Sequence, residues 1–293
     1  MTVTHETDAL RAELENLSVA EIRRTDFSRI VALTNEPNMP SGGGATVRRV
    51  LQLAGPLRGR PLLEVGSNTG YTSIELASWT DEHVYGIDVN PVSNEFARAK
   101  ASRMGIENVT FTLGNGMGGL PFDDGTFGLV FASNVTSFMD DHVSARDEYY
   151  RVLAPLGILA AVPIYYRTTP PAALVDEVAE AIGAPLPVTT PEYWRDLFSH
   201  PDATLIADEP YEYVRQTEER IAEYLANVMA QPHLAGLPAE LVTALSDRLG
   251  HFYRLFDENL SYAGYSIMLY RLGHPNPEPI LHTTRACPAG QSR

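Results

Sequence analysis

The sequence predicts an α/β fold with a doubly wound, mostly parallel sheet, and three observations support this prediction. Apolar strand patterns alternate with helical patterns over residues 61–163. The first apolar run leads into a turn bounded by Gly66 and Gly70, and the next run ends on the carboxylate of Asp88. Strands that alternate with helices form parallel sheets covered on both faces. A glycine-bounded turn answered by a carboxylate at the next strand end is typical of one half of a nucleotide site.

Residues 1–60 are predicted as an N-terminal helical lid with a glycine-rich loop. Apolar residues at helical spacing indicate one or two amphipathic helices over 9–31 and another over 45–53. Between them, Ser41 is followed by three glycines that lead into the second helix. Backbone N–H groups at the start of a helix attract anions, so we expect a lid over cofactor or substrate, with a flexible linker as the alternative. The predicted lid residues are Met39, Ser41, Gly42 and Gly43.

Residues 61–163 are predicted as the cofactor-binding core. One helix is well signalled, because Asn90 is a good N-cap and Pro91 suits the first helical position. The predicted strands are 61–66, 83–88, 108–113, 127–132 and 156–163. The predicted helices are 70–79, 91–103 and 143–154.

After Pro163 the alternation stops, and residues 164–260 are predicted as a helical cap that shapes a substrate region. This segment is too long for a plain connection. Its predicted helices are 171–182, 191–199, 214–229 and 238–256, with one strand at 203–208. Residues 261–272 read as a last core strand, and residues 273–293 as a flexible tail that carries four prolines.

Composition excludes several classes of protein and site. The net charge of −15 argues against a nucleic-acid partner, because phosphate binding needs a basic face. The single cysteine, Cys287, excludes an internal disulfide and a cysteine metal cluster. Histidines and carboxylates are scattered, so we expect no metal site. The polar start and the lack of a long apolar run lead us to expect a cytoplasmic protein that does not enter membranes. Whether the chain forms a homodimer is left open.

The residues of the turn after the first strand also limit the class of ligand that can bind there. A nicotinamide dehydrogenase of the simplest kind would have Gly-x-Gly-x-x-Gly here, but Asn68 and Tyr71 stand at two of those glycine positions. The Gly-Lys-Ser/Thr of a triphosphate-binding loop is absent. Glu64 precedes Gly66 by two residues, where a carboxylate would repel a pyrophosphate and attract an ammonium group.

Over residues 45–163, and including the strand 261–272, the chain resembles the class I S-adenosylmethionine-dependent methyltransferase superfamily. The resemblance rests on five motifs in order: Glu64-Val65-Gly66-Ser67-Asn68-Thr69-Gly70, Asp88, Gly114-Asn115-Gly116-Met117, 120–130 and 151–159. It implies a Rossmann-like, seven-stranded sheet and S-adenosylmethionine as cofactor. Asp88 would then bind the ribose, and Asn115 would lie near the adenine. The implied cofactor-binding residues are Glu64, Gly66, Ser67, Asn68, Gly70, Asp88, Asn115, Gly116, Met117, Ser133 and Asn134.

Two residues depart from the pattern of that superfamily. Asn68 replaces the middle glycine, so the turn is either less tight or joined by a side-chain hydrogen bond. Asn115 replaces the usual aspartate, and an amide still hydrogen-bonds adenine.

Candidates for catalysis lie after the fourth and fifth predicted strands, where catalytic groups of doubly wound folds are found. They are His142, Tyr165 and Tyr166. A structural role for His142 is the alternative, and Asp140 and Asp141 read as a helix cap rather than a base. Tyr224 and Tyr253 fall on apolar helix faces and are expected to pack in a core.

The resemblance therefore predicts methyl transfer from S-adenosylmethionine to an O, N or C atom of a small, natural-product-like acceptor. One alternative is transfer or cyclisation of the 3-amino-3-carboxypropyl group, which releases methylthioadenosine. Another is a non-catalytic protein that binds S-adenosylmethionine. The sequence identifies neither the acceptor nor the general base.

Overall fold

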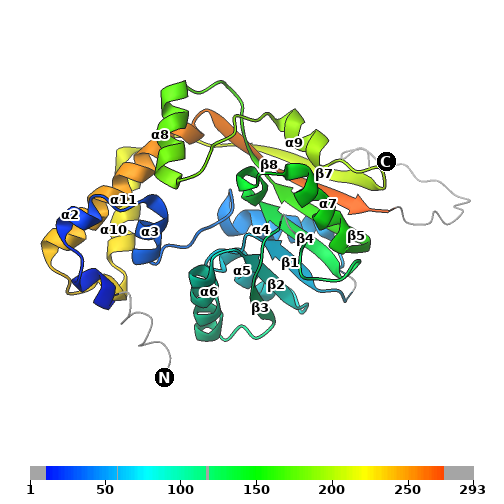
Figure 1. The fold of residues 1–293 in the computed structure, drawn as a ribbon, viewed down its shortest axis with the longest axis horizontal. Coiled ribbons are helices and arrows are strands. Elements are labelled where there is room, and N and C mark those ends of the chain that lie inside the picture. Colours follow the sequence, from blue (N-terminus) through cyan, green and yellow to red (C-terminus); the bar gives the residue numbers. More distant parts are fainter. Residues whose placement is uncertain (1–10, 58, 117–118, 274–293) are drawn as a thin grey trace, which may run out of the picture.

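The computed structural model describes residues 11–57, 59–116 and 119–273 of the chain. These residues form an eight-stranded sheet in the order β3-β2-β1-β4-β5-β8-β6, with β7 also paired to β8 (Figure 1). Strands β1 to β5 run parallel, and β8 is antiparallel to each of its neighbours. The doubly wound, mostly parallel sheet is confirmed. The strands are β1 (Leu62–Val65), β2 (Val84–Asp88), β3 (Val109–Leu113), β4 (Phe127–Ser133), β5 (Leu153–Val162), β6 (Ile164–Tyr166), β7 (Ala203–Glu212) and β8 (Ala263–Leu272).

The eight strands occupy seven positions across the sheet, because β6 continues the line of β5. Ala161 lies opposite Met268 and Ile164 opposite Tyr265, which is one unbroken register on β8. Pro163 lies between β5 and β6 and has no N–H to donate to the ladder. The strand is therefore interrupted at Pro163 without leaving its place in the sheet.

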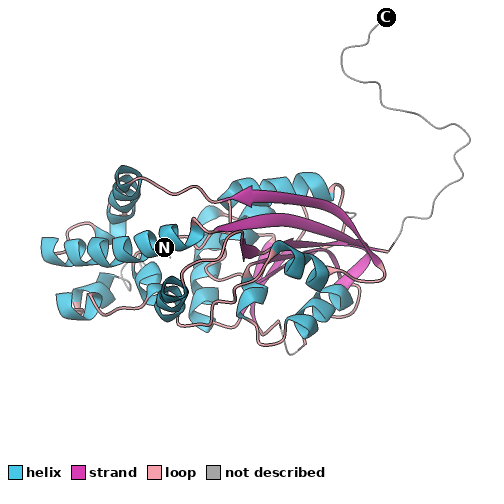
Figure 2. Ribbon diagram, turned by 90° about the horizontal axis from the view of Figure 1, so that it is seen from above, coloured by secondary structure: helices cyan, strands magenta, loops and turns pink. Residues whose placement is uncertain are grey.

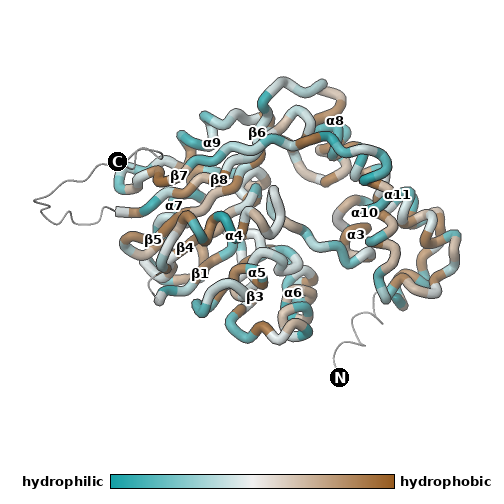
Figure 3. The backbone as a smooth tube through the Cα atoms, turned by 180° about the vertical axis from the view of Figure 1, so that it is seen from behind, coloured by the Kyte–Doolittle hydropathy of each residue, from teal (hydrophilic) through white to brown (hydrophobic). Residues whose placement is uncertain are grey.

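Helices cover both faces of the sheet, and each face has its own apolar cluster between the strands and the helices. Tyr149 and Trp194 are fully buried on one face, and Val47 and Leu76 are fully buried on the other. Figure 3 shows hydrophobic stretches along the central strands. The helices of the first face are α7 (His142–Val152) and α9 (Pro191–Phe198), and those of the second are α4 (Gly43–Ala54), α5 (Tyr71–Trp79) and α6 (Pro91–Met104), the last packed against α5 and β3.

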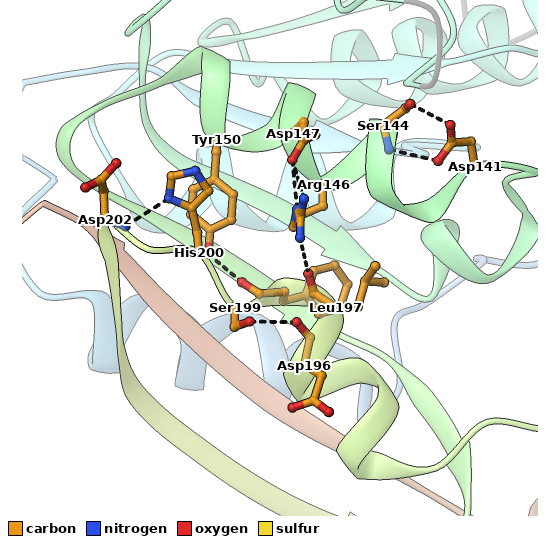
Figure 4. Close-up of polar contacts among 11 residues, drawn as sticks. Asp141, Ser144, Arg146, Asp147, Tyr150, Asp196, Leu197, Ser199, His200 and Asp202 are labelled. Carbon is orange, nitrogen blue, oxygen red and sulfur yellow. Dashed lines mark hydrogen bonds and ion pairs between the residues drawn. The ribbon is translucent and has the colours of Figure 1, made fainter.

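Helix α9 is held against α7 by polar contacts as well as by the apolar cluster (Figure 4). The Tyr150 hydroxyl donates to the Phe198 carbonyl at 2.7 Å, and Arg146 donates to the Leu197 carbonyl at 3.2 Å. The first turn of α7 is capped by Asp141, which accepts the Ser144 N–H at 3.0 Å. Asp141 is therefore a helix cap, as the sequence indicated.

The remaining helices form a bundle beside the sheet, on the left in Figure 1 and seen from above in Figure 2. Its core is one apolar cluster to which Leu14, Ile30, Leu225 and Phe252 contribute. The bundle elements are α2 (Val19–Ile22), α3 (Phe27–Leu33), α8 (Ala172–Ile182), α10 (Glu218–Met229), η2 (Pro232–Leu234) and α11 (Ala239–Leu260). No helix among the described residues is long and apolar enough to span a bilayer.

The structure divides two predicted segments. Helices α2 and α3 join the bundle, whereas α4 packs on the sheet, so residues 34–42 connect the two parts of the predicted lid. The segment 164–260, expected as a helical cap, also supplies β6, β7 and α9 to the sheet layer. The tail 273–293, apart from Gly273, lies outside the described residues.

Several element boundaries differ from the prediction, and prolines account for two of them. Helix α7 ends at Val152 rather than 154, because a residue before proline (here Pro155) disfavours helix. Strand β7 extends to Glu212 instead of 208, since Pro210 is tolerated in an edge strand that pairs only with β8. Helix α11 continues to Leu260 and leads directly into β8.

Candidate functional site

The turn between β1 and α5 is the centre of the site, and two of its residues must be glycine. Gly66 and Gly70 have φ angles of 78° and 82°, in the left-handed region. A Cβ on Gly66 would lie 2.5 Å from Val135 Cγ2, and one on Gly70 would lie 2.7 Å from Phe111 Cζ. A larger residue at either position would therefore clash as well as strain the backbone.

Asn68, which replaces the middle glycine of the motif, keeps the turn in its required conformation. Its φ is 43°, and asparagine is among the few non-glycine residues that adopt this region readily. Its backbone N–H donates to Asp88 Oδ2 at 2.9 Å, and its side-chain Oδ1 accepts the Thr69 N–H at 2.7 Å. The side chain joins the turn as an acceptor.

Asp88 lies at the carboxyl end of β2 and faces the turn. Its two oxygens accept the N–H groups of Asn68 and Asn90, both at 2.9 Å. A carboxylate has about four lone-pair sites, so acceptor capacity remains for a pair of hydroxyl groups. The carboxylate is thus oriented by the backbone before any ligand arrives.

Glu64 is buried beneath the turn, at the end of β1. It is 5% exposed and accepts a hydrogen bond from Ser73 Oγ at 2.5 Å. Burial raises the pKa of Glu64 to about 7, although hydrogen bonds from Ser73 and Thr72 oppose the shift. A cationic ligand group would favour the ionised carboxylate.

The raised pKa of Glu64 predicts how ligand binding depends on pH. Because an ammonium group binds the ionised form, affinity for S-adenosylhomocysteine should rise as pH increases, by up to about tenfold per unit, and level off above about pH 7. The stability of the ligand-free protein should show the opposite trend. Folding disfavours the ionised form of Glu64, so the contribution of this carboxyl to stability is lost as pH rises from its unfolded-state pKa towards 7. Calorimetry between pH 5.5 and 8.5 tests the first trend. A Glu64→Gln variant should bind weakly with no pH slope, and an equal slope in that variant would contradict the assignment.

The ends of β2 and β3 expose apolar side chains that the sequence reading did not single out. Val89 is 66% exposed and Leu113 is 55% exposed, and Leu113 pairs with Asp88 in the sheet. Both therefore lie beside the carboxylate, where a flat apolar ring system could pack. In the sequence, the signal for this apolar surface is Val89, directly after Asp88.

The neighbouring loop after β3 carries the residues predicted near the adenine. Asn115 is exposed, and Gly116 is buried. A Cβ on Gly116 would lie 2.9 Å from Met139 Cε, so the loop packs tightly against the segment that follows β4. Met117 lies outside the described residues.

Ser133 ends β4 and Asn134 follows it, at the carboxyl end of the parallel strands, where Asp88 also lies. Asn134 has a φ of 52°, and its Oδ1 accepts from Ser137 Oγ at 2.9 Å. Its N–H donates to the Val162 carbonyl at 3.0 Å. Asn134 thus shapes the turn, while Ser133 remains half-buried at the strand end.

The structure brings His142 together with a residue that sequence reasoning did not pair with it. His142 Nδ1 lies 2.6 Å from the Tyr193 hydroxyl, which comes from α9. The imidazole also packs 5.4 Å from the Trp194 ring. Burial lowers the pKa of His142, while the Asp141 carboxylate and the Met139 backbone oppose the shift. The net effect favours a neutral imidazole.

Tyr165 and Tyr166 point to opposite sides of β6 and are both buried. The Tyr165 hydroxyl lies 3.0 Å from Ser266 Oγ, and the Tyr166 hydroxyl donates to Asn259 Oδ1 at 2.8 Å. These bonds join β6 to β8 and to α11. Both hydroxyls are therefore engaged within the fold, whereas His142 contacts Tyr193 and Trp194 of α9.

The predicted lid residues follow α3 and lead into α4. The Ser41 hydroxyl lies 2.5 Å from that of Tyr213, and the Gly43 N–H donates to the Pro40 carbonyl at 2.8 Å. Gly42 has a φ of 76°, and a Cβ there would lie 2.3 Å from the Tyr265 hydroxyl. Met39 is 44% exposed.

The start of α4 also contacts the start of α5, directly after the glycine turn. A Cβ on Gly44 would lie 3.0 Å from the hydroxyl of Tyr71, the residue after Gly70. The two arginines that follow the lid are engaged by carboxylates: Arg48 with Glu75 at 2.7 Å and Arg49 with Glu209 at 2.5 Å. They therefore strengthen the attachment of α4 rather than supply free positive charge.

These features test whether an adenosyl ligand with an ammonium group fits. Asp88 offers acceptors for ribose hydroxyls, Glu64 a carboxylate for the ammonium, and Val89 with Leu113 apolar surface for the base. Two buried hydroxyls in the turn, Ser67 Oγ and Thr69 Oγ1, have no hydrogen-bond partner in the described part of the chain. The residues present fit such a ligand. Within the described residues, no cluster of three metal-ligating side chains occurs.

Comparison with known proteins agrees with this geometry. Residues 63–161 match the family model of a methyltransferase domain. The chain is 31% identical to the O-methyltransferase rstn1 of Aspergillus nomiae over 40% of its own length and 52% of that protein, so it spans about half the length of this relative. It is 29% identical to the 27-O-demethylrifamycin SV methyltransferase of Amycolatopsis mediterranei, over 78% of this chain and 84% of that one. The crystal structure of the MccD protein superposes with a TM-score of 0.67 at 24% identity, covering 80% of this chain and all of the other.

Proposed function

We propose that this chain, a member of the class I S-adenosylmethionine-dependent methyltransferase superfamily, transfers a methyl group to an O, N or C atom of a small organic acceptor. The observation that carries the proposal is the complete set of adenosyl-binding features around one turn: Asp88, Glu64 and the two obligatory glycines. S-adenosylmethionine supplies an electrophilic methyl group on a sulfonium. The protein's part is to hold this group in line with the acceptor atom.

Oxygen is the acceptor atom we favour, for two reasons. The relative from Aspergillus is named an O-methyltransferase, and the relative from Amycolatopsis is named for an O-demethyl substrate. A hydroxyl acceptor also needs a base, because it starts protonated. His142 is the proposed base: burial lowers its pKa, which favours the neutral imidazole, and it begins α7, after the loop that follows β4.

Tyr193 orients this base in the proposed mechanism. In this role the Nδ1–H of His142 donates to the Tyr193 hydroxyl, which fixes the ring and leaves the lone pair of Nε2 to take the acceptor proton. Tyr193 is 41% exposed, and Phe138, four residues before His142, is 49% exposed. Exposed aromatic surface beside a base suits an aromatic or polyketide-like acceptor better than a small ion.

The proposal is tested by turnover with a panel of hydroxylated and aminated small molecules. Formation of S-adenosylhomocysteine in an acceptor-dependent manner supports methyl transfer. Methylthioadenosine as the by-product would instead show transfer or cyclisation of the aminocarboxypropyl group. Tight binding of S-adenosylmethionine with no turnover on any compound would favour a non-catalytic binding protein.

A further inference from the structure

A buried carboxylate lies where the bridging segment leaves the helical bundle. Glu36 follows α3 and is only 5% exposed. Its Oε1 accepts a hydrogen bond from the Tyr224 hydroxyl of α10. The Tyr253 hydroxyl of α11 acts on the same carboxylate and stands edge-on to Tyr224, with ring centroids 5.3 Å apart. Three segments far apart in the sequence thus converge on one acidic group.

No described cation neutralises this carboxylate. Glu36 makes no ion pair among the described residues, and its Oε2 is buried without a partner of good hydrogen-bond geometry. Burial raises the pKa of Glu36, even though both tyrosine hydroxyls oppose the shift. Burying a carboxyl group this way is unfavourable for stability. An apolar residue would pack the same position more favourably, so a role beyond packing is the simplest explanation.

The position of Glu36 indicates what that role is. Two further bonds fix the chain just before it: Gln231 donates to the Thr34 carbonyl at 2.7 Å, and His233 Nε2 lies 3.0 Å from the Leu33 carbonyl. The far end of the same segment is fixed to the sheet by Ser41 and Tyr213, and it reaches the cofactor turn through Gly44 and Tyr71. Between these ends, Asn38 and Met39 are exposed.

We propose that Glu36, Tyr224 and Tyr253 form a latch that positions residues 37–44 against the cofactor turn. Glu36 is the positioning residue, and it acts on the cofactor site through the bridging segment. The bundle then controls how firmly the lid end, Gly42 to Gly44, stays beside Tyr71 and the adenosyl ligand. This proposal rests on the proposed function, since it assumes that S-adenosylmethionine or its product binds at the turn.

The test measures binding of S-adenosylhomocysteine by calorimetry, together with hydrogen exchange of residues 37–44. Glu36→Ala should raise Kd about tenfold and speed exchange in this segment, because a hydrogen bond to a charged group is lost. Glu36→Gln retains one acceptor oxygen and should restore most of the affinity. Tyr224→Phe should weaken binding as well, and adding it to Glu36→Ala should cause no further loss.

Matched controls separate a latch from a general loss of stability. Glu177→Gln on the exposed face of α8 and Tyr262→Phe beside β8 should leave both Kd and exchange unchanged. If Glu36→Ala lowers the melting temperature but leaves the Kd and the exchange of 37–44 unchanged, the latch is wrong and Glu36 is structural. If Glu36→Ala does not fold, Tyr224→Phe and Tyr253→Phe decide: each should raise the Kd and speed exchange of residues 37–44, and unchanged Kd and exchange in both folded variants would contradict the latch. If the unmodified protein fails to bind S-adenosylhomocysteine, the proposed function fails instead.

Discussion

Replacement of Asp88 by alanine is expected to weaken binding of S-adenosylmethionine and S-adenosylhomocysteine by about a hundredfold or more. The carboxylate is the proposed acceptor for two ribose hydroxyls, and hydrogen bonds to a charged group contribute roughly 1.5–3 kcal/mol each. The change also removes the acceptor for the Asn68 and Asn90 N–H groups, which hold the cofactor turn. Binding is measured by calorimetry, and folding by circular dichroism.

Two variants make this result interpretable. Asp88→Asn keeps an acceptor for one backbone N–H and should lose less affinity than alanine. Asp81→Ala, in the exposed turn before β2, removes the same charge elsewhere and should bind normally. Unchanged affinity in a folded Asp88→Ala protein would mean that the adenosyl group does not bind at this turn.

Replacement of His142 by alanine is expected to lower kcat about a hundredfold with a hydroxyl acceptor, because general bases contribute roughly 10²–10⁴ in rate. The Kd for S-adenosylhomocysteine should not change, since the proposed role of His142 is toward the acceptor and not toward the cofactor. Tyr193→Phe should lower kcat less, as it leaves the imidazole in place but removes its partner at 2.6 Å. The rates are measured with the acceptor identified in the turnover panel.

The pH profile supplies a second readout for the same residue. Burial lowers the pKa of His142, so the neutral base should be available below the pH at which a free histidine deprotonates. The acidic limb of kcat should disappear in His142→Ala. His251→Ala, on the exposed side of α11, is the matched control and should retain the normal profile. A His142→Ala enzyme with full kcat would show that another group, or none, takes the proton.

The turn proposed to bind the cofactor could be described from the sequence because its residues are local. Gly66, Asn68 and Gly70 lie within five residues, and Asp88 is fixed by the parallel pairing of β1 and β2. The substitution at Asn68 is explained by its left-handed φ of 43°, which asparagine adopts in place of glycine. At this position the residue type, together with the backbone region that it readily adopts, is enough to explain the departure from glycine.

The acceptor half depended on contacts between distant segments, which one sequence does not show. His142 and Tyr193 are 51 residues apart, and Glu36 and Tyr224 are 188 apart. Tyr165 and Tyr166 sit at the expected strand end, but β8 and α11 supply hydrogen-bond partners that turn both hydroxyls inward. Tyr224 and Tyr253 do lie on the bundle's inner face, yet a periodic pattern could not show the carboxylate between them.

The arginines after the lid show the same limit. The N–H groups at the start of α4 suggested an anion site, but the carboxylates of Glu75 from α5 and Glu209 from β7 pair with both arginines in the folded chain. The order of residues does not show which charged side chains from different elements will pair in the folded chain. The fold class, by contrast, followed from alternation alone, because parallel strands covered by helices leave few other arrangements.

The central claim, transfer of the methyl group, is tested most directly by turnover of doubly labelled S-adenosylmethionine. One heavy isotope marks the methyl group and another marks the aminocarboxypropyl arm, and mass spectrometry follows both labels. We predict that the acceptor gains only the methyl label and that S-adenosylhomocysteine retains the label of the arm. An acceptor that carries the label of the arm, with the labelled methyl group left on methylthioadenosine, would contradict the claim.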